Sequence, residues 1–253
     1  MQNMFVPSIP VEIVCCSVDD CIQAALGGAD RIELCGAITV GGLTPSLGTF
    51  LEAKQRISIP IVVMIRPRGA GFAYTEAEFK TMEQDARLFI EAGAEGLVFG
   101  CLHPDGRLDV ERMRRLVDIC GHREKVCHRC FDVVPNPEET LEQLIELGFD
   151  RLLTSGQRAF ATDGAPLIKR LAAQAADRIE ILPAGGLRMN NSAEFLQETG
   201  CRTLHLAPFI EQTDTSTRGN PEIEYAPTSL PKESVFHLTD RGQVEALVRA
   251  VRA

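Results

Sequence analysis

Short apolar runs alternate with longer amphipathic runs along nearly the whole chain, and this alternation leaves few folds open to it. Eight of the short runs are rich in Val, Ile, Leu or Cys, which is typical of parallel strands buried on both faces. The predicted strands are Val11–Cys16, Arg31–Cys35, Ile61–Arg66, Gly96–Cys101, Lys125–Cys130, Arg151–Thr154, Ile179–Ala184 and Thr203–Ala207.

A helical pattern follows each predicted strand and is bounded by capping residues. Ser17 precedes the first helical run and Gly27-Gly28 ends it, which is a typical pair of N-cap and C-cap signals. Asn136-Pro137 begins the fifth run, with Pro at the first helical position. The predicted helices are Val18–Leu26, Ser46–Arg56, Glu76–Ala92, Asp109–Cys120, Pro137–Leu147, Pro166–Ala176, Ser192–Thr199 and Gly242–Val251.

Eight βα units in 253 residues favour a (β/α)8 TIM barrel. No Gly-rich dinucleotide fingerprint follows the first strand and no Walker loop occurs, which argues against a doubly wound nucleotide-binding sheet. No linker divides the chain, so we expect one barrel domain over residues 11–253 after an N-terminal extension, residues 1–10. The largest irregular segment, about residues 208–238, is predicted to be a long loop between the eighth strand and the last helix, over the barrel mouth.

The charge balance bears on possible partners. Lys and Arg number 26 against 35 Asp and Glu, so the formal net charge is −9. Such a chain has no general attraction for nucleic acid or an anionic membrane surface, although a local basic pocket is still possible. The apolar runs are too short to span a bilayer, and residues 1–10 lack the pattern of a signal peptide. We therefore expect a cytoplasmic protein with no nucleic-acid or membrane partner.

Polar residues occur where the predicted strands end, which is where barrels of this type hold their active sites. Side chains at i and i+2 share a face of a strand, so several of these residues should point into the barrel. Glu33, Arg66, His128 and Asp132 are the candidate catalytic residues. The candidate ligand-binding residues are Glu12, Arg68, Thr154, Ser155, Gly185, Gly186 and His205.

Two interpretations of these polar residues remain open. They could form a structural cluster that fixes strand register, because buried charges must be paired. They could instead line a site for a small anion, in which Arg66 and Arg68 clamp a carboxylate or phosphate. Glu33 and His128 would then be an acid/base pair. Gly185-Gly186 after the seventh strand could bind phosphate through backbone amides, or could simply form a tight turn.

The chain has nine cysteines, an odd number that argues against a disulfide framework. Most are expected to be buried as small apolar residues. Cys127 and Cys130 have C-x-x-C spacing, but within the predicted strand they would point to opposite faces. A thiolate site is expected instead to join a cysteine of the first strand to Cys35 of the second, and thiolates favour soft ions such as Cu(I).

Five motifs in the same order resemble the CutC family, which is named for copper homeostasis. They are Glu33-Leu34-Cys35, Gly41-Gly42-Leu43-Thr44-Pro45-Ser46, Ile65-Arg66-Pro67-Arg68-Gly69, His128-Arg129 with Phe131-Asp132, and Leu153-Thr154-Ser155-Gly156. The resemblance covers about residues 11–207. It implies a (β/α)8 barrel, a cytoplasmic location, a homodimer or higher homo-oligomer, and copper bound by thiols of the first two strands.

The first strand departs from the family pattern. Relatives resemble Glu-hydrophobic-Cys there, whereas Val14 holds the Cys position in this chain and Cys15 follows one residue later. A shift of one residue turns a side chain to the other face of a strand. Cys35 and Cys15 are the candidate ligands for copper, expected as Cu(I).

Three functional hypotheses follow. The first is a CutC-like copper homeostasis protein that binds copper in the cytoplasm. The alternative is a TIM-barrel enzyme, a lyase, isomerase or hydrolase, that acts on a small anionic metabolite at the C-terminal mouth of the barrel. A third is a binding or chaperone role without turnover.

Overall fold

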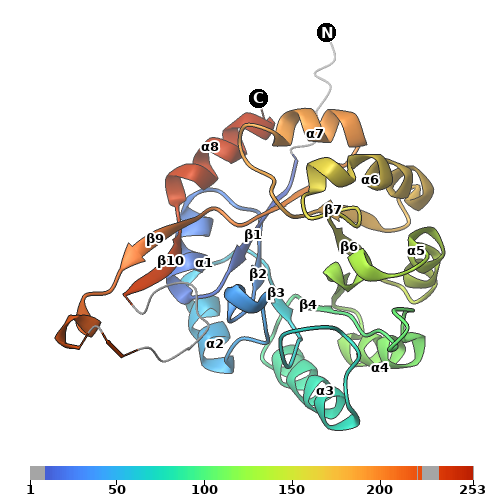
Figure 1. The fold of residues 1–253 in the computed structure, drawn as a ribbon, viewed down its shortest axis with the longest axis horizontal. Coiled ribbons are helices and arrows are strands. Elements are labelled where there is room, and N and C mark those ends of the chain that lie inside the picture. The colour runs from blue at the N-terminus through green and yellow to red at the C-terminus, as the bar shows by residue number, and fades with distance from the viewer. Residues whose placement is uncertain (1–8, 221, 224–233, 253) are drawn as a thin grey trace.

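Eight parallel strands form the wall of a barrel in the computed structural model, which describes residues 9–220, 222–223 and 234–252 (Figure 1). The strands are β1 (Val11–Cys15), β2 (Arg31–Leu34), β3 (Ile61–Met64), β4 (Gly96–Phe99), β5 (Glu124–Cys127), β6 (Arg151–Thr154), β7 (Glu180–Pro183) and β8 (Leu204–Leu206). The predicted (β/α)8 barrel is confirmed. Most of the predicted N-terminal extension, residues 1–8, lies outside the described residues.

The helices form a ring around the strands (Figure 1). They are α1 (Val18–Leu26), α2 (Leu47–Arg56), α3 (Glu76–Glu91), α4 (Val110–Cys120), α5 (Pro137–Glu146), α6 (Ala161–Ala175), α7 (Ser192–Thr199) and α8 (Arg241–Arg252). Ser17 caps α1 by accepting a hydrogen bond from the Asp20 amide, and Thr75 and Glu78 form a reciprocal capping box on α3. Sequence-encoded caps therefore set where these helices begin.

Side-chain alternation along the strands sorts residues into two layers, as the sequence predicted. Ile32 and Leu34 of β2 belong to the large apolar cluster between strands and helices. Cys35, directly after β2, belongs instead to a small cluster inside the barrel with Val62 and Met64 of β3. Glu33 is buried as well, so the inward face of β2 carries polar groups into the barrel.

The strand order is β7-β6-β5-β4-β3-β2-β1-β8, and no ladder hydrogen bonds join β7 to β8 in the described part of the chain. Side chains bridge this seam. Arg31 of β2 donates hydrogen bonds to Glu180 of β7 (2.7 Å) and to Thr203, just before β8 (3.3 Å). The barrel is therefore closed there by side chains instead of backbone pairing.

Helix α6 begins at Ala161, five residues before the predicted start at Pro166. The prediction placed proline at the first helical position, whereas it lies inside the helix. The added first turn of α6 packs closely on the loop that precedes it. A Cβ on Gly164 would lie only 1.9 Å from the Ser155 carbonyl oxygen, so a larger residue would not fit there. Glycine at 164 permits this contact, and the contact sets the start of the helix.

The segment predicted as an irregular loop at 208–238 instead contains a hairpin of β9 (Phe209–Thr213) and β10 (Val235–Thr239). A 3-10 turn, Ser216–Gly219, follows β9, and residues 221 and 224–233 of the predicted loop lie outside the described residues. The amide of Thr239 donates to Asp20 of α1 (2.7 Å). The hairpin therefore runs outward beside α1 and not across the barrel mouth (Figure 1). The β-branched and aromatic residues in both runs favour the strands.

None of the helices within the described residues has the length and apolar character needed to cross a bilayer.

Candidate functional site

A cavity of about 430 Å³ opens at the C-terminal ends of the strands. Its polar lining residues are Glu33, Arg66, His128, Arg129, Arg188 and His205, and the rest of the wall is mostly apolar or glycine. Four of these six are predicted site residues. The position matches the expected location of chemistry in such a barrel.

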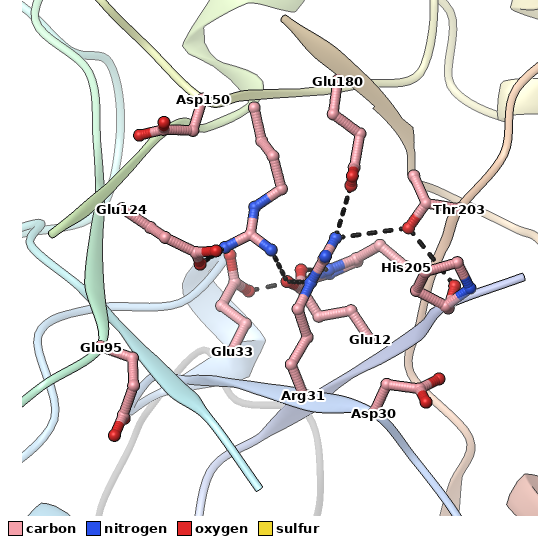
Figure 2. A network of polar contacts seen from close by, with 12 residues as sticks. Glu12, Asp30, Arg31, Glu33, Glu95, Glu124, Asp150, Glu180, Thr203 and His205 are labelled. Atoms are coloured by element: carbon pink, nitrogen blue, oxygen red, sulfur yellow. Dashed lines mark hydrogen bonds and ion pairs between the residues drawn. The ribbon is translucent and has the colours of Figure 1, made fainter.

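Glu33 and His205 both line this cavity, and Glu12 lies close to them (Figure 2). His205 Nδ1 is 2.7 Å from a carboxylate oxygen of Glu12, and its Nε2 is 3.7 Å from Oε2 of Glu33. The other oxygen of Glu33, Oε1, is buried and has no hydrogen-bond partner among the described residues. Glu33, a residue of the cavity wall, therefore has one uncommitted carboxylate oxygen.

A charged layer closes the barrel beneath Glu12 (Figure 2). Arg31 donates to Glu12 at 2.7 Å, and Nη1 of Arg151 lies 3.6 Å from the same carboxylate, while Nη2 of Arg151 pairs with Glu124. Buried charges persist only when they are paired in this way. The charges of the lower layer are thus paired, as the structural interpretation of the sequence expected, although Nε and Nη1 of Arg151 make no hydrogen bond among the described residues.

The two glutamates at this site have opposite pKa shifts. Burial alone raises the pKa of Glu12, but the hydrogen bond from His205 and the charges of Arg31 and Arg151 outweigh it and hold the pKa well below the usual value. Burial dominates for Glu33 and raises its pKa to about 7, despite the nearby His205. Burial lowers the pKa of His205, but Glu33 and Glu12 shift it further upward, so it is raised.

His128 is held rigidly at the cavity wall. Its Nδ1 accepts a hydrogen bond from the Cys130 amide (3.2 Å), and its ring packs on Phe72 with centroids 4.9 Å apart. Gly100 makes room for the ring, since a Cβ there would lie 2.7 Å from His128 Cε1. The remaining nitrogen, Nε2, is buried and has no hydrogen-bond partner among the described residues.

The two predicted anion-clamping arginines lie in different places. Arg66 lines the cavity but donates through its terminal nitrogens to the carbonyls of Val40, Gly42 and Ala70, which leaves only Nε unpartnered among the described residues. Arg68 does not line this cavity and instead pairs with Glu78 at 2.6 Å. Arg66 therefore fixes the loops at the mouth, and Arg68 fixes the loop before α3.

Asp132, Thr154 and Ser155 form a support behind the cavity. Asp132 lies in a 3-10 turn, Arg129–Val133, and accepts hydrogen bonds from the Thr154 and Ser155 hydroxyls and from the Ser155 amide. It also accepts from Arg129 Nε at 2.7 Å. Asp132 itself is not in the cavity wall, so its effect is to position Arg129 there.

Gly185 and Gly186 follow β7 and line the cavity with φ values of 99° and 75°. A Cβ on Gly185 would lie 3.4 Å from a terminal nitrogen of Arg129. The amides of both glycines donate no hydrogen bond to any residue that the structure describes. The exposed Arg188 stands on the same loop. Amides and guanidinium groups that converge in this way can bind an anion.

Two cysteines lie side by side next to the cavity. The sulfurs of Cys16 and Cys35 are 3.5 Å apart, whereas Cys15 points into the outer apolar layer. The structure thus pairs Cys35 with Cys16 and not with the predicted Cys15. The shift away from the family position turns Cys15 outward, and the next residue faces inward. Within the described residues, no three His, Cys, Asp or Glu side chains form a metal-binding group.

The C-x-x-C pair corrects one prediction. We expected Cys127 and Cys130 on opposite faces of a strand, but the strand ends at Cys127 and the 3-10 turn follows. The turn brings the two sulfurs to 3.8 Å. Both are fully buried in the outer apolar cluster, away from the cavity.

Sequence reasoning did not single out Arg129, Arg188, Phe72 or Cys16 as site residues. Arg129 directly follows His128 within a family motif, and Arg188 closes the Gly-Gly-Leu-Arg run after β7, so both had a usable signal. Nothing local to the sequence indicated Phe72, which reaches the cavity from the loop between β3 and α3.

Known proteins resemble this chain over nearly its whole length. Residues 9–210 match the model of the CutC family. The chain is 42% identical to a CutC family protein of Treponema denticola, over 96% of this chain and 99% of that protein. It is 45% identical to the copper homeostasis protein cutC homolog of Homo sapiens, over 94% of this chain and 87% of that protein.

Solved structures give a matching result. A CutC structure from Streptococcus agalactiae superposes with a TM-score of 0.75 at 34% identity, covering 78% of this chain and 97% of that one. A thiamine phosphate pyrophosphorylase from Pyrococcus furiosus has a TM-score of 0.55 at 14% identity, with 96% of both chains covered. The second likeness shows a shared fold alone.

Proposed function

The chain belongs to the CutC family, and on that premise we propose that it is a copper homeostasis protein that binds copper(I) as its cargo through Cys16 and Cys35. The observation that carries the proposal is the 3.5 Å separation of the two sulfurs. Soft thiolates are the ligands that favour Cu(I). Met64, whose thioether is also soft, packs in the same apolar cluster as Cys35.

Copper binding at this pair would release protons. The contact with Cys16 and, after it, burial raise the pKa of Cys35 far above the usual thiol value, so this side chain is a thiol in the metal-free protein. A thiol must lose its proton to bind a metal. A reducing cytoplasm suits this site and is part of the proposal, because all nine cysteines are free.

An anaerobic Cu(I) titration against a chromophoric chelator tests the proposal. Cys35→Ser and Cys16→Ser should each lose competitive binding, whereas Cys15→Ser should keep it, since Cys15 faces the outer layer. Unchanged binding in both of the first two variants, or no competitive binding by the wild type, would refute it.

We propose in addition that the protein forms a homodimer or higher oligomer. The projecting hairpin supports this, because Phe236 on it is 48% exposed and offers an apolar surface to a second copy. Light scattering should give a mass of at least two chains, and a monomeric mass at micromolar concentration would contradict the idea.

The cavity supports a second function, namely binding of a small anionic metabolite by an enzyme of the lyase, isomerase or hydrolase type. The observation that favours it is that Glu33 Oε1 and His128 Nε2 are both buried at the cavity without partners among the described residues. Buried polar atoms are normally hydrogen-bonded, so these two atoms are available to a ligand that enters the cavity. Arg129 and Arg188 would hold its anionic group.

A thermal-shift screen with inorganic phosphate and small carboxylates tests this second function. Arg129→Ala should abolish stabilisation by the anion. Arg170→Ala is the control, because this exposed arginine of α6 pairs with Glu138 and lies outside the cavity. If no anion stabilises the wild type, or both variants behave alike, the anion site is refuted.

A further inference from the structure

We propose that the cavity carries out proton transfer on a small carbonyl compound that bears a phosphate or carboxylate group, with Glu33 as general base and His128 as the hydrogen-bond donor to the carbonyl oxygen. This inference rests on the anion site proposed above. It assigns that site a substrate class and a reaction, and it gives the two unpartnered buried atoms different roles.

The hydrogen bonding of His128 decides which nitrogen carries its proton. Because Nδ1 accepts the Cys130 amide hydrogen at 3.2 Å, the neutral ring must carry its proton on Nε2. Phe72 and the absence of a Cβ at Gly100 fix the ring in this orientation. His128 therefore presents an N–H donor at the cavity before any ligand arrives, which is the preorganisation that stabilises a developing oxyanion.

Glu33 has the surroundings of a general base. Its Oε1 is the uncommitted atom, and Oε2 faces His205 at 3.7 Å. Glu12 holds His205 in place from the other side at 2.7 Å. Glu33 and His128 line the same cavity, so one bound substrate can contact both side chains.

The anionic group of the substrate would bind on the loop after β7. Gly185 and Gly186 have free amides there among the described residues, and Arg129 reaches the same loop with Nη1, while its Nη2 donates to the Ser155 hydroxyl at 2.6 Å. Asp132 holds Arg129 in this position at 2.7 Å. The anion would thus be held apart from Glu33 and His128, which leaves the carbonyl end of the substrate for them.

The proton-transfer step balances without a further reactant. Glu33 Oε1 takes a proton from the carbon next to the carbonyl, and the electrons of that C–H bond form a carbon–carbon double bond. The carbonyl π electrons move to oxygen, where the Nε2–H of His128 stabilises the charge. The proton on Glu33 exchanges with solvent, and Glu33 then delivers a solvent-derived proton to the same carbon as the carbon–carbon double bond opens and the carbonyl re-forms, which gives hydrogen exchange.

Proton NMR in D2O tests the step, with dihydroxyacetone phosphate and pyruvate as probes. The wild type should speed deuterium incorporation next to the carbonyl of at least one probe. Glu33→Gln should slow it on the order of 100-fold while inorganic phosphate still stabilises the variant, and His128→Gln should slow it by a similar factor.

The outcomes separate the two proposals. If phosphate binds but neither probe exchanges above the buffer rate, the proton-transfer proposal is overturned and the anion site stands. Exchange by Glu33→Gln at the wild-type rate also overturns it. If phosphate fails to bind the wild type, the anion site falls, and this inference falls with it. Arg170→Ala, a change at an exposed arginine of α6 outside the cavity, should leave both readouts unchanged.

Discussion

Replacing Glu33 with Gln should make the protein more stable at alkaline pH. Burial raises the pKa of Glu33 from the ordinary value of 4.5 to about 7, so ionising it costs more in the folded chain than in the unfolded one. Below pH 4.5 both states are protonated and the cost is absent. It grows between pH 4.5 and 7, and above 7 it is constant at about 3 kcal/mol, since each pKa unit corresponds to about 1.4 kcal/mol.

The uncharged amide that the Glu33→Gln substitution introduces removes this cost, and His205 keeps Glu12 as its partner, so no buried cation is left alone. Urea unfolding followed by circular dichroism at pH 5 and pH 8.5 measures the effect. We expect a gain of about 3 kcal/mol at pH 8.5, roughly 10 °C in Tm, and a much smaller gain at pH 5. A loss of stability at pH 8.5, or an equal change at both pH values, would refute the reasoning.

Three other outcomes are expected. Glu12→Gln should lower the free energy of unfolding by about 3–5 kcal/mol at pH 7, because it leaves two arginines and a histidine short of a partner. This loss should fade as the pH falls below 4.5, where the Glu12 carboxylate becomes protonated in the unfolded chain. A loss under 1 kcal/mol by urea unfolding at pH 7 would contradict this. Gly100→Ala should lower the free energy of unfolding by about 1–3 kcal/mol and displace His128, which a shifted imidazole NMR signal would show. Gly71→Ala is the control and should be near neutral, because a Cβ at Gly71 meets open space. Equal effects of the two variants would show that Gly100 makes no room for the His128 ring. Cu(I) affinity should rise about tenfold per pH unit from deprotonation of Cys35 alone, and a flat competition titration between pH 6 and 8 would oppose thiol ligation.

The barrel itself was predictable from the sequence because its units repeat. Each strand had to be buried on both faces, and each helix carried its own start and stop signals, so local patterns agreed with the global fold. Asn136-Pro137 and Thr75 show this, since α5 and α3 begin at these signals. Helix α6 departs from its signal because packing of Gly164 outweighed the proline rule.

The inward direction of the polar residues was also predictable, because alternation along a strand needs only its register. Glu33, Arg66 and His205 face the barrel as expected. What each one contacts depends on loops that periodicity does not describe. Arg66 is committed to three loop carbonyls, and Arg68 lies outside the cavity, so two similar arginines have separate structural tasks.

The thiol pairs show where a strand boundary changes the chemistry. The strand β5 ends at Cys127, three residues before the predicted end. Cys127 and Cys130, which we expected on opposite faces of a strand, therefore have their sulfurs 3.8 Å apart. A hydrogen bond from a backbone amide to His128 stabilises the tight turn that does this. Boundaries are decided by such single contacts, which composition cannot reveal.

The unpaired seam between β7 and β8 also affects how the barrel opens. Among the described residues, the terminal strand β8 has ladder partners only on β1, so it can leave the wall by breaking one row of backbone hydrogen bonds where an inner strand must break two. Hydrogen exchange should therefore report β8 and the elements after it as a separate opening unit of lower free energy. His205 lies on that strand, so each such opening would carry one member of the Glu12–His205–Glu33 array away from the other two.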